Sequence, residues 1–269
     1  MTILQATILG IVQGLTELLP ISSSAHLFLI PWIFNWDIPE SFDVALHFGT
    51  LLAIGIFFFK DWIELIKGGF NQLVKKKKTT EGKMFWYIVL ATIPGGIIGF
   101  ILDKYAESIL TKPIIIAIAL IIMGIILYIV DKKCKSETEY KNMTLKQTFL
   151  IGLSQSLAFI PGVSRSGITM TTGRLMGVKR ESAAKYSFML SAPIVLAATI
   201  FKLKDFIEFF SIADMTGIIA FAMGVIMSFI VGIIVIKFLL EYLKKGSFKG
   251  FAIYRVIVGI IVIAICIIR

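Results

Sequence analysis

Glu17 and Arg165 are charged residues that lie inside long apolar stretches of the sequence. Charges at such positions are rare, and they are functional candidates by default. Glu17 lies just before an interruption at 20–26, and Arg165 lies within a second interruption at 161–167. The two side chains could form a structural ion pair or take part in chemistry, and the residues beside them favour chemistry.

The second interruption has the composition of an anion-binding site. Ser164 and Ser166 flank Arg165, with one glycine before them and another after them. Glycines let backbone N–H groups approach an anion closely, and the helix that is expected to begin near Ser164 favours negative charge at its N-terminus. Arginine offers a bidentate fork for phosphate oxygens, and Thr169 follows about one helical turn later on the same side. The segment therefore predicts a phosphate-binding site.

The first interruption contains side chains suited to nucleophilic and acid–base chemistry. A run of three serines at 22–24 and His26 lie at a break that opens a helix. A hydroxyl nucleophile needs a base, and a leaving group needs an acid. Glu17, Ser23 and His26 supply these types within ten residues. An N-cap role for Ser22 and a hydrogen bond from His26 to a carbonyl are the structural alternatives.

Metal ligands are sparse in the sequence. It has no Cys/His metal spacing and no phosphate-binding loop of the Walker type. A diphosphate nevertheless needs charge neutralisation, so a divalent cation, Mg²⁺ or Ca²⁺, is expected. Glu17 and Gln13 are its evident oxygen ligands, four residues apart on one helical face, with substrate and water completing the coordination. His47 follows Asp43 at the i+4 spacing, which favours a local pair or cap over a ligand.

Composition identifies the setting as a membrane. Of the 269 residues, 57% are apolar and 16% are charged, and the mean hydropathy is +0.90. A soluble domain is about half apolar and about a quarter charged. These values exclude a cytosolic enzyme and a nucleic-acid-binding module, and they indicate an integral membrane protein in contact with the lipid bilayer.

The positive charges predict the orientation. The first 59 residues contain no Lys or Arg, and the positives then cluster between apolar runs, at 60–83, 132–146, 179–185 and 237–249. By the positive-inside rule these segments are expected to be cytoplasmic loops, and the sparser loops at 103–112 and 202–214 to lie outside. The four lysines at 75–78 are read as a topology signal, with a contact to anionic lipid headgroups as the alternative.

Six apolar runs are long enough to cross a bilayer, and two further stretches are apolar but interrupted. The six runs are 42–59, 84–103, 113–130, 186–201, 216–236 and 250–268. The interrupted stretches, 1–36 and 146–178, read as re-entrant helix–loop–helix hairpins, because irregular backbone at membrane depth must be buried in protein or line a wet cavity. Gly10 and Gly14 form a small-xxx-small pair that predicts close packing against another helix.

The two interrupted stretches resemble each other. Residues 10–15 align with 152–157, Pro20 matches Pro161, and with one gap the serines at 22–24 fall on 164–166. Each hairpin precedes three spanning runs, so a single membrane domain, 1–269, is expected to contain a first repeat at 1–132 and a second at 142–269. An odd number of spans makes the repeats inverted, as in many transporters, and their broken helices meet near the midplane. This all-α architecture would bring Glu17 and Arg165 together.

Both interruptions match motifs of a known family, and the sequence resembles the undecaprenyl-diphosphate phosphatases, or bacitracin-resistance proteins. The family's first motif, [EQ]-G-x-T-E-x-x-P-x-S-S-x-x-H, is matched from Gln13 to His26. Its second motif, P-G-x-S-R-S-G-x-T, is matched from Pro161 to Thr169 without a departure. The resemblance covers the whole length and includes a weaker run at 91–95.

The resemblance implies hydrolysis of undecaprenyl diphosphate to the monophosphate and phosphate. This reaction recycles the lipid carrier of peptidoglycan synthesis and confers bacitracin resistance. The resemblance also implies a multi-pass protein of the bacterial plasma (inner) membrane, a divalent cation, and an active-site cleft open to the outer face. The residues that match the family's essential positions are Glu17, Ser23 and Arg165, supported by Gln13, Ser22, His26, Ser164 and Thr169. His26 is expected to take part in catalysis, and the residues expected to bind the substrate phosphate are Ser22, Ser164, Arg165, Ser166 and Thr169. Members often have Glu where this chain has Gln13, which suggests a supporting ligand and not the base.

A transporter or flippase of a phosphorylated polyprenyl lipid is the alternative function, because inverted repeats with a midplane site are also the architecture of transporters. A type 2 phosphatidic acid phosphatase is excluded, since its S-R-x5-H pattern would need His where this chain has Thr171. The sequence does not decide between a phosphoserine intermediate and direct attack by water. It leaves open the identity of the cation, the preferred prenyl length and whether the protein flips lipid. It also leaves the oligomeric state open, with a homodimer as one alternative.

Overall fold

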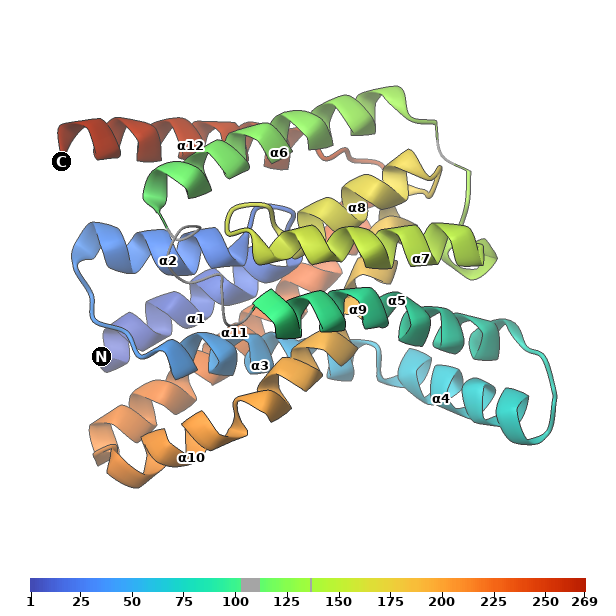
Figure 1. Cartoon of the computed structure of the whole chain (residues 1–269), viewed down its shortest axis with the longest axis horizontal. Helices are drawn as coiled ribbons and strands as arrows, with labels where there is room; N and C mark the ends of the chain where they lie inside the picture. Colours follow the sequence, from blue (N-terminus) through green and yellow to red (C-terminus); the bar gives the residue numbers. More distant parts are fainter. Residues whose placement is uncertain (103–111, 136) are drawn as a thin grey trace.

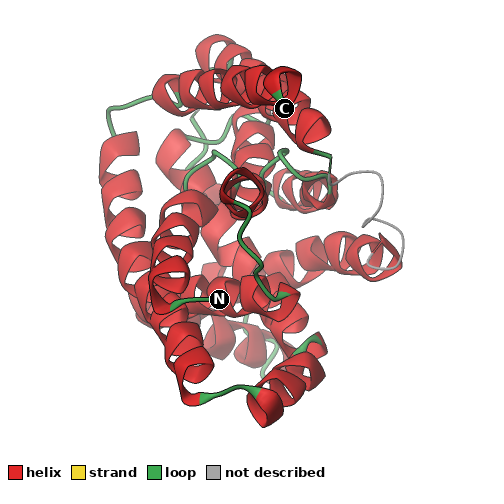
Figure 2. Cartoon of the chain, turned by 90° about the vertical axis from the view of Figure 1, so that its left-hand side faces the viewer, coloured by secondary structure: helices red, strands yellow, loops and turns green. Residues whose placement is uncertain are grey.

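The computed structural model describes residues 1–102, 112–135 and 137–269, and these residues fold as a bundle of helices (Figure 1). Within these ranges the only β-type pairing is an isolated bridge between Thr138 and Val178. The all-α prediction is therefore confirmed for the described residues. Both termini lie at one end of the bundle, and they face the viewer in the turned view of Figure 2.

Each interrupted stretch forms two helices separated by a break. The first stretch contains α1 (Ile3–Leu18) and α2 (Ser23–Phe34). The second contains α7 (Leu145–Ser154), the 3₁₀ helix η2 (Gln155–Phe159) and α8 (Arg165–Leu175). Both stretches begin with a capping box, in which a Thr side chain and a Gln side chain satisfy the free N–H groups of the first turn. The breaks lie where the sequence predicted them, at the two Pro-containing segments.

The predicted spanning runs are all helical in the described residues. They are α3 (Glu40–Phe57), α5 (Thr80–Leu102), α6 (Pro113–Lys133), α9 (Arg180–Phe201), α11 (Met215–Leu243) and α12 (Lys249–Ile268). All except α3 are individually long and apolar enough to cross a membrane. Helix α3 continues after Phe58 into α4 (Phe59–Val74), and this pair is bent by 78°. The protein is a multi-pass membrane protein.

Four of the segments predicted to be loops are largely helical. The basic segment 60–83 contains nearly all of α4, and the segment 202–214 contains α10 (Leu203–Ile212). The basic segment 179–185 forms the first turns of α9, and most of 237–249 belongs to the end of α11. The prediction failed because charge clusters were taken as loop signals, whereas Lys and Glu are good helix formers that project into water from one face. The predicted outer loop at 103–112 lies almost entirely outside the described residues. A short 3₁₀ helix, η1 (Tyr140–Asn142), interrupts the loop between α6 and α7.

The end of the bundle opposite the termini carries basic loops. Figure 1 shows the α4–α5 and α6–α7 connections at this end, and these contain the first two lysine clusters. Large apolar side chains such as Ile122, Ile234 and Ile260 are exposed along the spanning helices. Exposed isoleucines on helices of this length are stable when they face lipid.

Helix α11 packs closely against both α1 and α3. A Cβ atom added at Gly14 would lie 2.7 Å from Val231 Cβ, and one added at Gly49 would lie 2.8 Å from Ser228 Cβ. Gly10 meets the backbone of Gly224 in the same way. The predicted close packing of the Gly10–Gly14 pair is confirmed, and it places α1 and α3 side by side on α11.

Candidate functional site

Both breaks use the same helix cap. Ser22 begins α2 with φ 76°, and Ser164 begins α8 with φ 73°. Each Oγ accepts a hydrogen bond from the backbone N–H three residues later, at 3.4 Å from Ala25 and at 3.0 Å from Gly167. In both breaks the capping hydroxyl also lies 3.2 Å from the serine hydroxyl two residues further along. The breaks thus present two helix N-termini with matching serine geometry.

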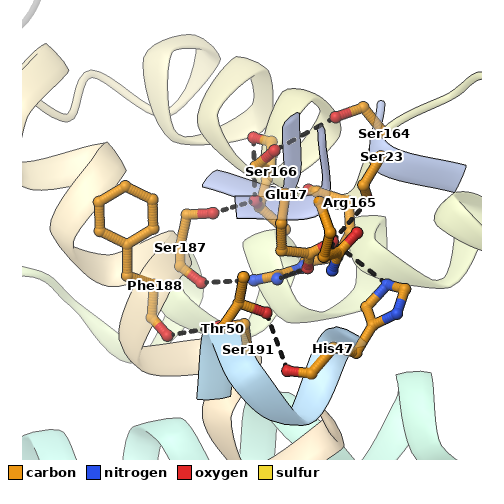
Figure 3. A network of polar contacts seen from close by, with 12 residues as sticks. Glu17, Ser23, His47, Thr50, Ser164, Arg165, Ser166, Ser187, Phe188 and Ser191 are labelled. Atoms are coloured by element: carbon orange, nitrogen blue, oxygen red, sulfur yellow. Dashed lines mark hydrogen bonds and ion pairs between the residues drawn. The ribbon is translucent and has the colours of Figure 1, made fainter. Parts of the chain in front are cut away.

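The carboxylate of Glu17 is the centre of the polar cluster between the breaks (Figure 3). Its Oε1 accepts a hydrogen bond from the Arg165 guanidinium, and the two residues form an ion pair. Its Oε2 accepts a hydrogen bond from Ser23 Oγ at 2.5 Å and one from Gln13 Nε2 at 3.3 Å. His47 Nε2 lies 3.3 Å from the same oxygen. Glu17 is 6% exposed, so a buried carboxylate joins the two breaks.

Arg165 is anchored on its other side by α9. Its guanidinium donates a hydrogen bond to the carbonyl of Ser187 at 3.1 Å. The hydroxyl of Thr169 donates to the Arg165 carbonyl at 2.7 Å and lies 2.8 Å from Ser187 Oγ. Ser166 Oγ donates to the Leu19 carbonyl at 2.9 Å. Thr169 and Ser166, which were predicted to bind phosphate, therefore make contacts that hold Arg165 and the first break in place.

His26 lies apart from the Glu17 cluster. Its Nδ1 is 2.7 Å from the Ser22 carbonyl, and its Nε2 is 2.8 Å from the Tyr254 hydroxyl. The imidazole also stacks on the Tyr254 ring, with centroids 5.7 Å apart. Among the described contacts, no hydrogen bond joins His26 to Glu17, Ser23 or Arg165. The geometry matches the carbonyl-bonding alternative that the sequence left open.

His47 is a residue that the sequence reasoning placed outside the site. The expected local contact exists, since Nδ1 is 2.8 Å from the Asp43 carbonyl. In addition to this local contact, Nε2 reaches Glu17, a partner that the i+4 spacing did not predict. The i+4 spacing indicated only the local partner, and the contact with Glu17 depends on the packing of α3 beside α1.

Arg255 is a second residue that the sequence reasoning missed. Its side chain is fully buried, and it donates hydrogen bonds to carbonyls of both breaks, at 3.1 Å to Pro20, 2.7 Å to Gly162 and 2.9 Å to Val163. A further hydrogen bond reaches the Leu120 carbonyl on α6 at 3.3 Å. A charge inside the apolar run 250–268 was the available signal. Arg255 links the backbones of the two breaks.

The residues beside Glu17 fit a divalent cation. Gln13 Oε1 is buried and has no hydrogen-bond partner among the described residues. This amide oxygen and the Glu17 carboxylate are hard donors of the kind that Mg²⁺ and Ca²⁺ prefer. In the described part of the chain, no three His, Cys, Asp or Glu side chains are arranged so that they alone could hold a metal ion. A cation held here would take its remaining ligands from phosphate oxygens and water.

Comparison with known proteins assigns the family. The model of the bacitracin resistance protein BacA family matches residues 6–261, which include both breaks and Arg255. The chain belongs to this family. A relative from Pelotomaculum thermopropionicum is 49% identical over 266 residues, which cover 98% of this chain and 97% of the relative. A relative from Caldicellulosiruptor bescii is 46% identical over 271 residues, covering 100% and 99% of the two chains. Both relatives are named undecaprenyl-diphosphatase.

Proposed function

We propose that the protein is an undecaprenyl-diphosphatase. It hydrolyses undecaprenyl diphosphate to undecaprenyl phosphate and inorganic phosphate, and so recycles the lipid carrier of peptidoglycan synthesis and confers bacitracin resistance. The observation that carries the proposal is the buried contact of Glu17 with both Ser23 and Arg165, in a chain that matches undecaprenyl-diphosphatases over nearly its full length. A base, a hydroxyl and a guanidinium are the groups that phosphoryl transfer requires.

Arg165 and the N-terminus of α8 hold the terminal phosphate of the substrate. The guanidinium has five N–H donors, and its contacts with Glu17 and Ser187 leave donors for phosphate oxygens. The first N–H groups of α8 add a positive potential at the same point. Because the site is buried, these charges act in a medium of low dielectric constant and stabilise the transition state strongly.

Ser23 is the nucleophile, and Glu17 is its base. The hydroxyl already donates a hydrogen bond to Glu17 Oε2, so its proton has an acceptor at 2.5 Å. Ser23 Oγ attacks the terminal phosphorus, the bond to the bridging oxygen breaks, and undecaprenyl phosphate leaves. Water then cleaves the phosphoserine and releases phosphate. Trapping a radiolabelled phosphoserine peptide around Ser23 tests this route, since direct attack by water forms no phosphoserine.

Gln13 and His47 hold the carboxylate in place. Gln13 Nε2 and His47 Nε2 each lie 3.3 Å from Glu17 Oε2, whereas Arg165 contacts the other carboxylate oxygen. A divalent cation, Mg²⁺ or Ca²⁺, would be held by Glu17 and the free Gln13 Oε1, and it would neutralise the diphosphate charge. Orienting the base in this way lowers the cost of reaching the reactive geometry.

Two inverted repeats, 1–132 and 142–269, form the scaffold. Helix pairs across the proposed repeats support this, because α1 packs against α11 as α7 packs against α5, and α3 packs against α11 as α9 packs against α5. Helix α4 follows α3, and α10 follows α9, so each repeat has an additional helix after the matching member of this pair. With the basic loops in the cytoplasm of a bacterium, the site opens toward the outer face of the inner membrane. This architecture also occurs in transporters, but the relatives that match the chain are named undecaprenyl-diphosphatase and therefore favour the enzyme.

Phosphate release from undecaprenyl diphosphate by the detergent-purified protein tests the function. Wild-type protein is expected to release phosphate, with EDTA suppressing the rate and Mg²⁺ or Ca²⁺ restoring it. Glu17→Gln should abolish release, because the amide cannot accept the Ser23 proton. Glu139→Gln is the matched control, since Glu139 is an exposed carboxylate that pairs with Lys179 far from the breaks. Absence of release by the wild type, with the lipid still bound, would overturn the proposal.

A further inference from the structure

An apolar cavity of about 250 Å³ lies between α5, η2 and α9. Its wall consists of apolar side chains and glycines, principally Gly96, Gly99, Phe159, Ile194, Ala198 and Phe201. Among the described residues that line it, none has a charged or hydrogen-bonding side chain. Its predominantly apolar lining suits a hydrocarbon chain.

Glycines keep the α5 wall of the cavity open. Gly96 is exposed, and a Cβ added there would meet no atom within 4 Å, so the cavity is open to the surface beside this residue. A Cβ at Gly99 would instead meet the Phe159 ring, whose close approach therefore depends on this glycine. Glycine inside a helix costs about 1 kcal/mol relative to alanine in other proteins. Gly96 and Gly99 both face the cavity, and larger side chains at these two positions would fill part of its volume.

One face of α9 connects the cavity to the polar cluster. The Ser187 carbonyl accepts the hydrogen bond of Arg165 at 3.1 Å. Ile194 and Ala198 follow Ser187 after seven and eleven residues, which places all three on the same helix face. At 1.5 Å per residue, the two cavity residues are about 10 Å and about 17 Å along α9 from Ser187.

The second break meets the same cavity from another direction. Phe159 ends η2, two residues before Pro161 and shortly before the N-terminus of α8. Gln155, at the start of η2, packs against Gly95 on α5: its Cγ atom lies 3.0 Å from the position that a Cβ atom on Gly95 would take. The cavity therefore begins where the polar groups end, on the Arg165 side of the site.

We propose that this cavity binds the isoprenoid chain of the substrate, at the units that follow the ones next to the diphosphate. The proposal rests on the proposed function, because it takes a prenyl diphosphate as the ligand held at Arg165. A chain that leaves the diphosphate along α9 reaches Ile194 after the first unit, and the open space beside Gly96 accepts its methyl branches. Burial of the chain there favours long substrates over short ones.

Gly96→Leu tests the proposal with little risk to folding. The leucine side chain would enter the open space, and leucine is the better helix former. Gly55→Leu on α3 is the matched control, because a Cβ at Gly55 also meets nothing within 4 Å and Gly55 does not line the cavity. Steady-state kinetics are compared for undecaprenyl diphosphate and for dimethylallyl diphosphate, whose single isoprene unit is too short to reach Ile194.

Gly96→Leu is expected to raise KM for undecaprenyl diphosphate roughly tenfold with kcat unchanged, since several methylene groups lose their binding surface. The kcat/KM for dimethylallyl diphosphate should stay at the wild-type value. Gly55→Leu should leave the kinetic parameters for both substrates unchanged. An unchanged KM for the long substrate would overturn the proposal and leave the cavity to membrane lipid. An equal fall in kcat/KM for the long and the short substrate would also overturn the proposal. Failure of the wild type on both substrates would instead refute the proposed function.

Photocrosslinking gives an independent measurement. An undecaprenyl diphosphate analogue with a photoreactive group on its third isoprene unit should label the peptides that contain 95–99 and 194–201. Unlabelled undecaprenyl diphosphate should suppress the labelling, and an equal excess of phosphatidylglycerol should not. Labelling that is confined to other helices would contradict the proposal.

Discussion

The two breaks share the geometry of a helix cap and differ in the side chain that follows the cap. Ser22 and Ser164 have nearly the same positive φ, and each caps its helix through Oγ. The next residue is Ser23 in the first break and Arg165 in the second. One scaffold therefore presents a hydroxyl nucleophile on one side of Glu17 and a guanidinium on the other. The matching caps place the two side chains, and the difference between Ser23 and Arg165 gives the two breaks different roles.

The residues that precede the breaks show the same combination of likeness and difference. Gln13 and Gln155 occupy matching positions, and the Oε1 of each is buried without a hydrogen-bond partner in the described part of the chain. Glu17 has no acidic counterpart in η2, which is apolar beyond Gln155 and Ser156. The first break therefore carries the base, and the second leads to the apolar cavity.

Arg165→Ser would make the second break resemble the first, and it should have the largest effect. Loss of the guanidinium removes the main positive charge from the terminal phosphate, so kcat is expected to fall by about 10³-fold or more. Phosphate release measures the effect, and thermal unfolding in detergent serves as the control for folding. Retention of more than a tenth of the wild-type rate would contradict the role given to Arg165.

Ser23→Ala is expected to lower kcat by about 10²-fold or more, while the lipid still binds. The nucleophile is lost, but Arg165 and the α8 N-terminus still hold the phosphate. Ser24→Ala is the matched control, because its hydroxyl contacts Ser22 and not Glu17. Equal losses in the two variants would show that the serine run acts only in folding.

Arg255→Met should damage both breaks together. It leaves carbonyls of Pro20, Gly162 and Val163 without their buried donor. Each such loss costs about 1–3 kcal/mol. We expect the midpoint of thermal unfolding to fall by roughly 5 °C or more, together with kcat. Arg255→Lys should recover part of both, since an ammonium group can reach only some of these carbonyls. An unchanged midpoint would argue that the two breaks are held by other contacts.

His47→Ala should lower kcat about tenfold, because one hydrogen bond to a charged group is worth about 1.5 kcal/mol. KM should change little if His47 acts on Glu17 and not on the substrate. His47→Gln, which keeps a side-chain donor, is the comparison variant and should recover activity. A rise in KM with unchanged kcat would place His47 in substrate binding.

Ser22→Ala and Ser164→Ala should have the smallest effects, and the two effects should be alike. Loss of a serine N-cap costs about 1 kcal/mol, and the same cap is present in each break. Thermal unfolding of both variants measures the two costs side by side. A much larger loss in one variant would show that the shared backbone geometry does not imply shared energetics.

The sequence predicted the helices and the breaks well, because these depend on local signals. Apolar runs of sufficient length predicted the spans, and Pro followed by Ser predicted where helices end and restart. The prediction of loops failed at 60–83, 179–185, 202–214 and 237–249, because charged residues are compatible with helices and do not by themselves indicate a loop. The contact between Glu17 and Arg165, which are 148 positions apart, followed from matching the two breaks and not from any local pattern.

What the sequence determined by itself is the chemistry available at each break: Glu17, Ser23 and Arg165, and the helix N-termini beside them. Only the tertiary structure decided that His47 joins this cluster and that Arg255 ties the breaks together. His47 reaches Glu17 because α1 and α3 both pack on α11 through glycines, including Gly14 and Gly49. A local pattern reports neighbours within about one turn of a helix, whereas close approach between helices depends on which backbones can touch.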